Sequence, residues 1–217
     1  MESKLVDRYQ LAIYDLLAKV RSTQREVIEK AGAIIAEALM ENHRVFLGGI
    51  CHYTEHDLLY RGGGPIFYKP YKPDETKLEA GDVLVVSSVS GRTVSTVNLA
   101  YDSVEAGVKV IAFTSMAYAT AVDPVHSSGK KLYEIADVTL DNCAPAAEAM
   151  LDVDGIEAKF AAASGIASDY IMWSITAAVV EKMLAAGHTP GILKSNNFPG
   201  GMEYNEEVKK HFESFGY

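Results

Sequence analysis

The sequence predicts an α/β fold, with a five-stranded, mostly parallel sheet flanked by helices and an N-terminal helical extension. Five short apolar runs, often β-branched, lie at residues 45–47, 66–68, 83–86, 108–113 and 138–140. Between several of these runs, apolar residues recur every three or four positions, the period of an amphipathic helix. Strands that alternate with helices favour a parallel sheet, because parallel strands need long crossover connections.

The first 42 residues are predicted to form a helical segment that precedes the main domain. Apolar residues recur at helical spacing over residues 3–41. A capping-box pattern, Thr23-x-x-Glu26, leaves open whether this stretch is one helix or two. The segment packs either on a partner subunit or over the core of its own chain. Residues 43–217 are predicted to form the second unit, the sheet-containing domain.

The remaining elements follow in chain order, and glycine or proline ends most of them. We expect them at residues 45–47 (strand), 53–61 (helix), 66–68 (strand), 83–87 (strand), 93–106 (helix), 108–113 (strand), 132–135 (short helix), 138–140 (strand), 166–186 (helix) and 203–214 (helix). Residues 69–81 and 116–131 are predicted to be irregular. Residues 141–164 show a mixed pattern that predicts no defined element.

Composition excludes several classes of protein. The chain has 217 residues and is 48% hydrophobic, yet it contains no apolar run long enough to cross a membrane. Its formal net charge is −9 and its Lys and Arg residues form no long run, which argues against nucleic-acid binding. Only two cysteines are present and no signal-peptide pattern opens the chain, so we expect reduced thiols and a cytoplasmic location.

The stretch at residues 82–93, DVLVVSSVSGRT, carries the clearest functional signal. A buried strand runs into a loop of hydroxyls and glycine, and a helical pattern follows. A helix N-terminus offers unpaired N–H groups and partial positive charge, which suit a phosphate. The alternative is an ordinary serine-rich turn in which Thr93 caps the helix. Arg92 either pairs with the phosphate or points to solvent.

Other polar residues follow neighbouring strands at the same predicted edge of the sheet. Ligands in parallel α/β sheets bind at the carboxyl ends of the strands. Gly49 ends the first strand, Thr114 and Ser115 end the fourth, and Asn142 follows the fifth. We therefore expect these residues to face the same ligand as the loop at residues 87–93.

These motifs resemble the SIS (sugar isomerase) domain family. The family's phosphate loop reads Ser-x-Ser-Gly-x-Thr, and residues 88–93 fit it fully. Residues 128–138 with 141–143, and the tail around residues 195–205, are similar to a branch of small, poorly characterised bacterial SIS proteins. The resemblance covers nearly the whole chain. It implies a flavodoxin-like three-layer sandwich that binds sugar phosphates and assembles into homodimers or homotetramers.

The resemblance implies a set of phosphosugar contacts in this chain. They are Gly49, Cys51, Ser88, Ser90, Gly91, Arg92, Thr93, Thr114, Ser115, Asn142 and Asn197. Two departures stand out. Cys51 replaces a hydroxyl that relatives carry after the first strand, and a thiol is a weak donor. The segment at residues 64–81 is also shorter than in close relatives, so it lacks an acid and a histidine that relatives place near the pocket.

The run at residues 51–57, CHYTEHD, contains the candidates for chemistry. His52, Glu55 and His56 are candidate acid/base residues for a sugar proton. His52 and His56 are four apart, so we expect them on one helical face, where they are also candidate ligands of zinc or another divalent metal. Some phosphoheptose isomerases, which are SIS relatives, hold zinc near the corresponding helix. The alternative is that these side chains are only polar pocket lining or a subunit surface.

Cys51 and Asn197 each have two interpretations. Cys51 precedes a helix that would lower its pKa, so it is either a reactive thiol or a small buried residue. Asn197 lies in a polar tail that either closes a partner's pocket or forms a surface turn.

Three functions remain open from the sequence. The first is a sugar-phosphate isomerase that moves a proton between adjacent carbons through an enediol or enediolate and requires no cofactor. The second is a non-catalytic phosphosugar sensor or partner subunit. The third, the effector domain of a transcription regulator, is disfavoured because no basic helix-turn-helix precedes the domain.

Overall fold

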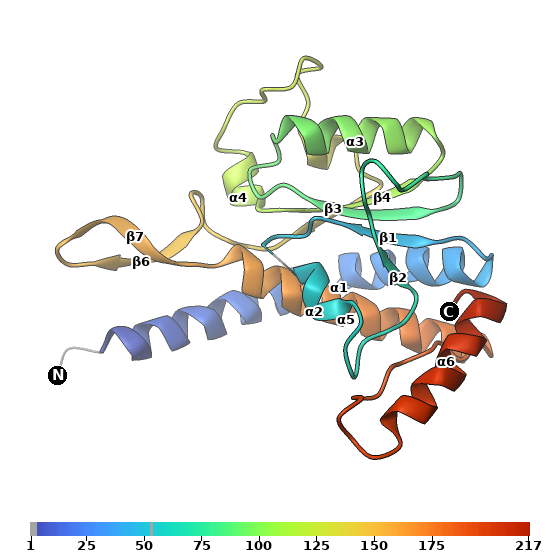
Figure 1. Cartoon of the computed structure of the whole chain (residues 1–217). Coiled ribbons are helices and arrows are strands. Elements are labelled where there is room, and N and C mark those ends of the chain that lie inside the picture. The colour runs from blue at the N-terminus through green and yellow to red at the C-terminus, as the bar shows by residue number, and fades with distance from the viewer. Residues whose placement is uncertain (1–3, 53) are drawn as a thin grey trace.

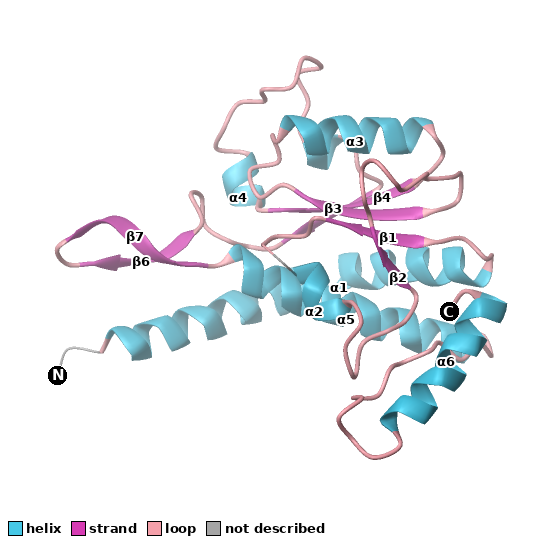
Figure 2. Cartoon of the chain, viewed as in Figure 1, coloured by secondary structure: helices cyan, strands magenta, loops and turns pink. Residues whose placement is uncertain are grey.

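The computed structural model describes residues 4–52 and 54–217 (Figures 1 and 2). Two predicted positions lie outside the described residues. They are residue 3, where the first helix was predicted to begin, and residue 53, where the second was predicted to begin. The helices are α1 Leu5–Met40, α2 Thr54–Leu58, α3 Val94–Glu105, α4 Met116–Ala119, the 3₁₀ helix η1 Leu132–Glu134, α5 Ser164–Ala185 and α6 Gly201–Phe215. The strands are β1 Val45–Gly48, β2 Tyr68–Pro70, β3 Val83–Ser87, β4 Lys109–Thr114, β5 Val138–Asp141, β6 Ala149–Val153 and β7 Ile156–Ala162.

The central sheet has five parallel strands in the order β2-β1-β3-β4-β5, which confirms the predicted fold class. The chain leaves β1 toward β2 on one side and returns to β3 on the other side. β1 and β3 are therefore direct neighbours, and Gly48 at the end of β1 is paired with Val86 near the end of β3. Helix α3 covers one face of the sheet, whereas α1 and α5 cover the other (Figure 2).

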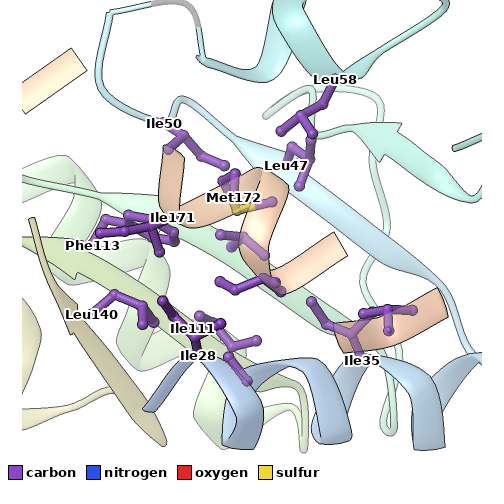
Figure 3. Close-up of a cluster of buried hydrophobic side chains, with 14 of the residues drawn as sticks. Ile28, Ile35, Leu47, Ile50, Leu58, Ile111, Phe113, Leu140, Ile171 and Met172 are labelled. Atoms are coloured by element: carbon purple, nitrogen blue, oxygen red, sulfur yellow. The ribbon is translucent and has the colours of Figure 1, made fainter. Parts of the chain in front are cut away.

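The larger core lies between the sheet and the pair α1–α5. Ile35 of α1, Ile111 and Phe113 of β4 and Ile171 of α5 are fully buried there (Figure 3). The two helices approach closely at Gly32, where an added Cβ would lie 2.7 Å from the Cβ of Ala178. A second, smaller core under α3 is formed by Leu84 and Val86 with Val97 and Ala100.

The N-terminal segment is one continuous helix rather than two. Thr23 does not cap a new helix, because its hydroxyl donates to the carbonyl of Lys19, 2.8 Å away, within the same helix. A threonine can bond back to the preceding turn in this way, which explains why the capping pattern was misleading. The second half of α1 is buried against the sheet and α5, whereas the first half extends beyond them (Figure 1).

A two-stranded antiparallel hairpin, β6–β7, was not predicted. It projects from the body of the molecule beside the first half of α1, and Arg8 donates to the carbonyl of Asp152, 2.6 Å away (Figure 1). Most of β7 is exposed, so its sequence lacks the alternating apolar pattern of a half-buried strand. The second strand of the sheet also begins two residues later than predicted, at Tyr68.

No helix within the described ranges, 4–52 and 54–217, is both long enough and apolar enough to cross a membrane.

Where β1 and β3 begin, the buried carboxylate of Asp82 forms an ion pair with Arg44, whose side chain is 33% exposed. The carboxylate of Asp82 accepts from the backbone N–H of Arg44 (2.9 Å), from its Nη2 (2.6 Å) and from the backbone N–H of Glu79 (3.0 Å). Burial alone would raise the pKa of Asp82, but the hydrogen bonds from Arg44 and Glu79 lower it below the usual 3.8. This pair ties the entry of β1 to the entry of β3.

Asp82→Asn should lower the free energy of unfolding by about 2–4 kcal/mol at pH 7, because a buried acceptor of charged hydrogen bonds is lost. Since the folded pKa of Asp82 is lowered, its stabilisation is complete above the unfolded pKa and is lost as the pH falls through the folded pKa. Urea unfolding of both proteins between pH 7 and pH 3 should show the difference shrinking only in acid.

Glu79→Gln is the matched control, because its exposed carboxylate lies 3.5 Å from the same guanidinium. It should cost less than about 1 kcal/mol. An equal loss in both variants would contradict the special role of Asp82.

Candidate functional site

The candidate site lies where the loops after β1 and β3 meet. The strand order reverses between these two neighbours, and open α/β sheets bind ligands at such a switch point. A cavity of about 400 Å³ is found there, lined by Gly49, Cys51, His52, Glu55, Ser87, Ser88 and Val89. Four of the predicted site residues, Gly49, Cys51, His52 and Glu55, thus share a cavity with Ser88 of the predicted phosphate loop.

The loop at residues 88–93 has the geometry of an anion cradle. The hydroxyl of Ser88 lies 2.9 Å from the hydroxyl of Thr93 and accepts from the backbone N–H of Thr93 at 3.3 Å. Helix α3 begins at Val94, and no side chain within the described residues caps its first N–H groups. Ser90 and Arg92 are half-buried on the same loop.

Gly91 is required by the conformation of this loop. Its φ of +70° lies in the left-handed region, and an added Cβ would lie 3.3 Å from the Cβ of Ala119. Its carbonyl also accepts from the backbone N–H of Leu132 at 2.7 Å. These contacts fix the loop against α4 and η1.

Thr114, Ser115 and Asn142 are fully buried and hydrogen-bond to the backbone around the site. Thr114 donates to the carbonyl of Val89 (3.1 Å), and Ser115 donates to the carbonyl of Ala144 (2.6 Å). Asn142 accepts from the backbone N–H of Ala144 at 3.1 Å. None of the three lines the cavity, so they support the loops, and their role as sugar contacts stays a prediction.

The turn after β1 has an unusual backbone that the sequence did not reveal. Gly49, Cys51 and His52 have φ values of 70°, 24° and 54°. Ser87 holds this turn, because its hydroxyl accepts from the N–H of Cys51 (2.8 Å) and donates to the carbonyl of Gly49 (3.1 Å). The sequence placed Ser87 at the start of the loop at residues 87–93, but its bonds to the turn after β1 were not predicted, because they depend on the pairing of β1 with β3.

Cys51 has the environment of a structural thiol. Burial raises its pKa, and the nearby Glu148 carboxylate adds to the rise, although hydrogen bonds with Ser168 and Ser87 oppose it. Only 4% of the residue is exposed. Because the thiolate is the nucleophile, a raised pKa argues against the reactive interpretation and for the buried one.

Glu55 is the acid that the structure brings to the cavity. Its Oε2 accepts from the backbone N–H of Ile50 at 2.9 Å, so the first turn of α2 is tied to the loop after β1. The carboxylate is half-buried and lies in the same cavity as Ser88. A carboxylate in such a place can accept a proton from a bound ligand.

The two histidines are not on one helical face, which corrects the sequence prediction. α2 begins at Thr54, whereas His52 lies in the left-handed turn before it. Both His52 and His56 are exposed. No group of three metal-ligating side chains comes together among the residues that the structure describes, and a metal role for His52 and His56 stays a prediction.

Asn197 lies away from the switch point in this chain. It lines a different cavity, between residues 60–69, which run into β2, the loop at residues 193–197 and α6. The two cavities share no residue. The prediction that Asn197 contacts the sugar is therefore not tested by the switch-point cavity of this chain.

The profile of the SIS domain matches residues 69–115, which include β3, the candidate phosphate loop and α3. A UPF0309 protein of Streptomyces griseus is 32% identical, with 97% of this chain and 96% of the relative covered. The UPF0309 protein TTE0306 of Caldanaerobacter subterraneus is 30% identical, with 96% and 98% covered.

Solved structures share the fold at low sequence identity. Phosphoheptose isomerase from Neisseria gonorrhoeae has a TM-score of 0.55 at 15% identity, with 80% of this chain and 94% of that chain covered. The Vibrio vulnificus NanR protein complexed with ManNAc-6P has a TM-score of 0.52 at 15% identity, with 98% and 69% covered. With the Ser-x-Ser-Gly-x-Thr loop placed between β3 and α3 and relatives matched end to end, the chain belongs to the SIS domain family, in its UPF0309 branch.

Proposed function

We propose that this protein binds a sugar phosphate at the switch point between β1 and β3 and isomerises it between aldose and ketose forms. One observation carries the proposal: the cavity that contains Ser88 of the phosphate loop also contains the carboxylate of Glu55. A phosphate anchor and an acid/base group in one cavity are what proton transfer on a bound sugar requires. The shared fold with phosphoheptose isomerase supports the same reaction class.

The phosphate would be held by Ser88, Ser90, Thr93 and the first N–H groups of α3. Hydroxyl and backbone donors suit this anion in an acidic chain, because locally oriented N–H groups outweigh distant net charge. Val89 and the backbone of Gly49 would then lie along the sugar. The ligand's reactive carbons would extend toward the loop after β1 and α2.

Glu55 would act as the acid/base group. Its carboxylate takes the proton from the carbon beside the carbonyl, and the bonding electrons move onto the carbonyl oxygen to give an enediolate. Return of the proton to the adjacent carbon, with proton exchange between the two oxygens, gives the isomer. No oxidant, reductant or metal is consumed, so the step balances with this chain's residues alone.

The second candidate is a non-catalytic phosphosugar sensor. It is favoured by the segment at residues 64–81, which is expected from the family resemblance to be shorter than in close relatives, and by the raised pKa of Cys51. Together they leave few reactive groups beside Glu55. The two candidates share the phosphate anchor and differ in what Glu55 does.

Glu55→Gln should abolish most proton exchange while leaving sugar-phosphate binding within about threefold. A glutamine oxygen still accepts from the N–H of Ile50, but it is not basic, and loss of a general base typically costs about 10²–10⁴ in rate. Deuterium incorporation from heavy water into a panel of pentose, hexose and heptose phosphates measures the exchange.

Glu41→Gln, on an exposed residue at the end of α1, is the control and should exchange at the wild-type rate. If the wild-type protein binds a sugar phosphate without exchanging any carbon-bound proton, the isomerase proposal fails and the sensor remains.

We also propose that the protein is a homo-oligomer joined through the first half of α1 and the hairpin. Val6, Leu11 and Tyr14 on α1 are 63%, 59% and 69% exposed, and Phe160 on β7 is 49% exposed. These side chains lie on the two elements that project from the body (Figure 1). A second copy would bury this apolar surface and stabilise a helix that its own chain covers only in part.

Light scattering should give at least twice the mass of one 23.5 kDa chain. Leu11→Lys with Tyr14→Lys should lower the mass to that of one chain, whereas Leu11→Met with Tyr14→Phe should not. A wild-type protein that stays monomeric at micromolar concentration would contradict the assembly.

A further inference from the structure

A second cavity, which shares no residue with the candidate site, has no role in the proposed reaction. Its volume is about 860 Å³, within the range of small-molecule sites, whereas the switch-point cavity is about 400 Å³. Its walls come from residues 60–69, which run into β2, from the loop at residues 193–197 and from α6. Helix α6 is at the opposite end of the molecule from the hairpin (Figure 1).

The cavity is strongly cationic in a protein of net charge −9. It is lined by four cationic side chains and one acidic one: Arg61, Lys69, Lys194, Lys209 and Glu206. Arg61 is paired with Asp57, and Lys209 lies 2.6 Å from Glu206, so these two charges are already partly neutralised.

Lys69 and Lys194 keep their charge available for a ligand. Among the described residues, neither ammonium group has a carboxylate within 4 Å. Instead Lys194 lies over the ring of Tyr204, 4.1 Å from its centroid, and Lys69 lies 5.4 Å from the centroid of Phe212. An exposed aromatic face stabilises a cation less than a charge-assisted hydrogen bond to a phosphate does.

The polar wall is rigid before any ligand arrives. Asn205 is buried and bonds to both the N–H and the carbonyl of Lys194, at 2.8 and 2.9 Å, and to Oδ1 of Asn196 at 2.8 Å. Gly62 packs so tightly on this loop that an added Cβ would lie 2.6 Å from the N of Ser195. A preformed wall lowers the entropy cost of binding.

The cavity also offers an apolar face. Tyr60 lines the cavity and is 77% exposed. Ile66, Leu193 and Met202 line the same cavity. An exposed aromatic ring in the same cavity as two ammonium groups without a carboxylate partner suits a ligand that joins a ring to an anion.

We propose that this cavity is a second ligand site, which binds a phosphate ester of metabolite size whose ring lies against Tyr60. Lys69 and Lys194 hold the phosphate, while Asn196 and Asn197 bond to the polar groups of the ring. Asn197 lies in the polar tail and does not line the switch-point cavity of its own chain. A second ligand site gives this polar tail a role. Both nucleoside monophosphates and cyclic sugar phosphates carry this chemistry.

Calorimetric titration with AMP, glucose 6-phosphate and inorganic phosphate tests the site. The titrations use a Ser88→Ala/Ser90→Ala background, so that the phosphate loop makes no contribution. We expect AMP or glucose 6-phosphate to bind with Kd below about 1 mM, and the identity of the binder assigns the ring as a base or a sugar.

Lys69→Gln with Lys194→Gln should weaken that binding about tenfold or more, since two charged contacts to the phosphate are lost. Tyr60→Ala should weaken the ring-bearing ester and leave inorganic phosphate unchanged. Lys30→Gln with Lys182→Gln removes two exposed charges elsewhere and should change nothing. Unfolding without ligand, followed by circular dichroism, checks that each variant is folded.

Three outcomes would overturn the second site: no binding by any probe, binding of inorganic phosphate alone, or equal losses in the cavity and control lysine pairs. None of these outcomes bears on the proposed isomerisation, because the titrations use the Ser88→Ala/Ser90→Ala variant, which lacks two phosphate-loop hydroxyls. Conversely, the exchange rate of Glu55→Gln depends only on the switch-point site and carries no information about the second site.

Discussion

The adjacency of β1 and β3 is the constraint on which the rest of this molecule depends. Because the chain goes to β2 before returning to β3, two loops that are far apart in sequence end side by side at one edge. Ser87 then joins them directly, through its bonds to the backbone of Cys51 and Gly49. At the other edge, Asp82 and Arg44 join the entries of the same two strands. Hydrogen bonds thus join β1 and β3 at both of their ends, and the candidate site lies at their carboxyl ends.

Sequence reasoning predicted the sheet because its strands are buried on both faces and read as continuous apolar runs. It predicted the phosphate loop for a local reason, since the strand, the hydroxyl-rich turn and the helix are consecutive. The hairpin β6–β7 was missed because β7 is largely exposed and β6 is mostly half-buried, so neither strand leaves an alternating pattern. The capping pattern at Thr23 was misleading because a threonine hydroxyl also bonds back within a continuous helix.

The site around the loop was harder to predict, for physical reasons. The left-handed backbone at Cys51 and His52 has no sequence signature, yet it removes His52 from the helix that carries His56. Burial raises the pKa of Cys51. Cys51 belongs to a core cluster that includes Ala167 and Ile171 of α5, which are distant in sequence. Glu55 could be named as a candidate from its residue type, but its place in a cavity with Ser88 follows only from the pairing of β1 with β3.

A complex with a bound sugar phosphate tests the central claim most directly. Crystals grown with a sugar phosphate that stabilises the protein should show its phosphate within about 3 Å of the hydroxyls of Ser88, Ser90 or Thr93 and of the first N–H groups of α3. The sugar should then extend toward Glu55. A phosphate located only beside Lys69 and Lys194, with the switch-point loop unchanged, would contradict the account.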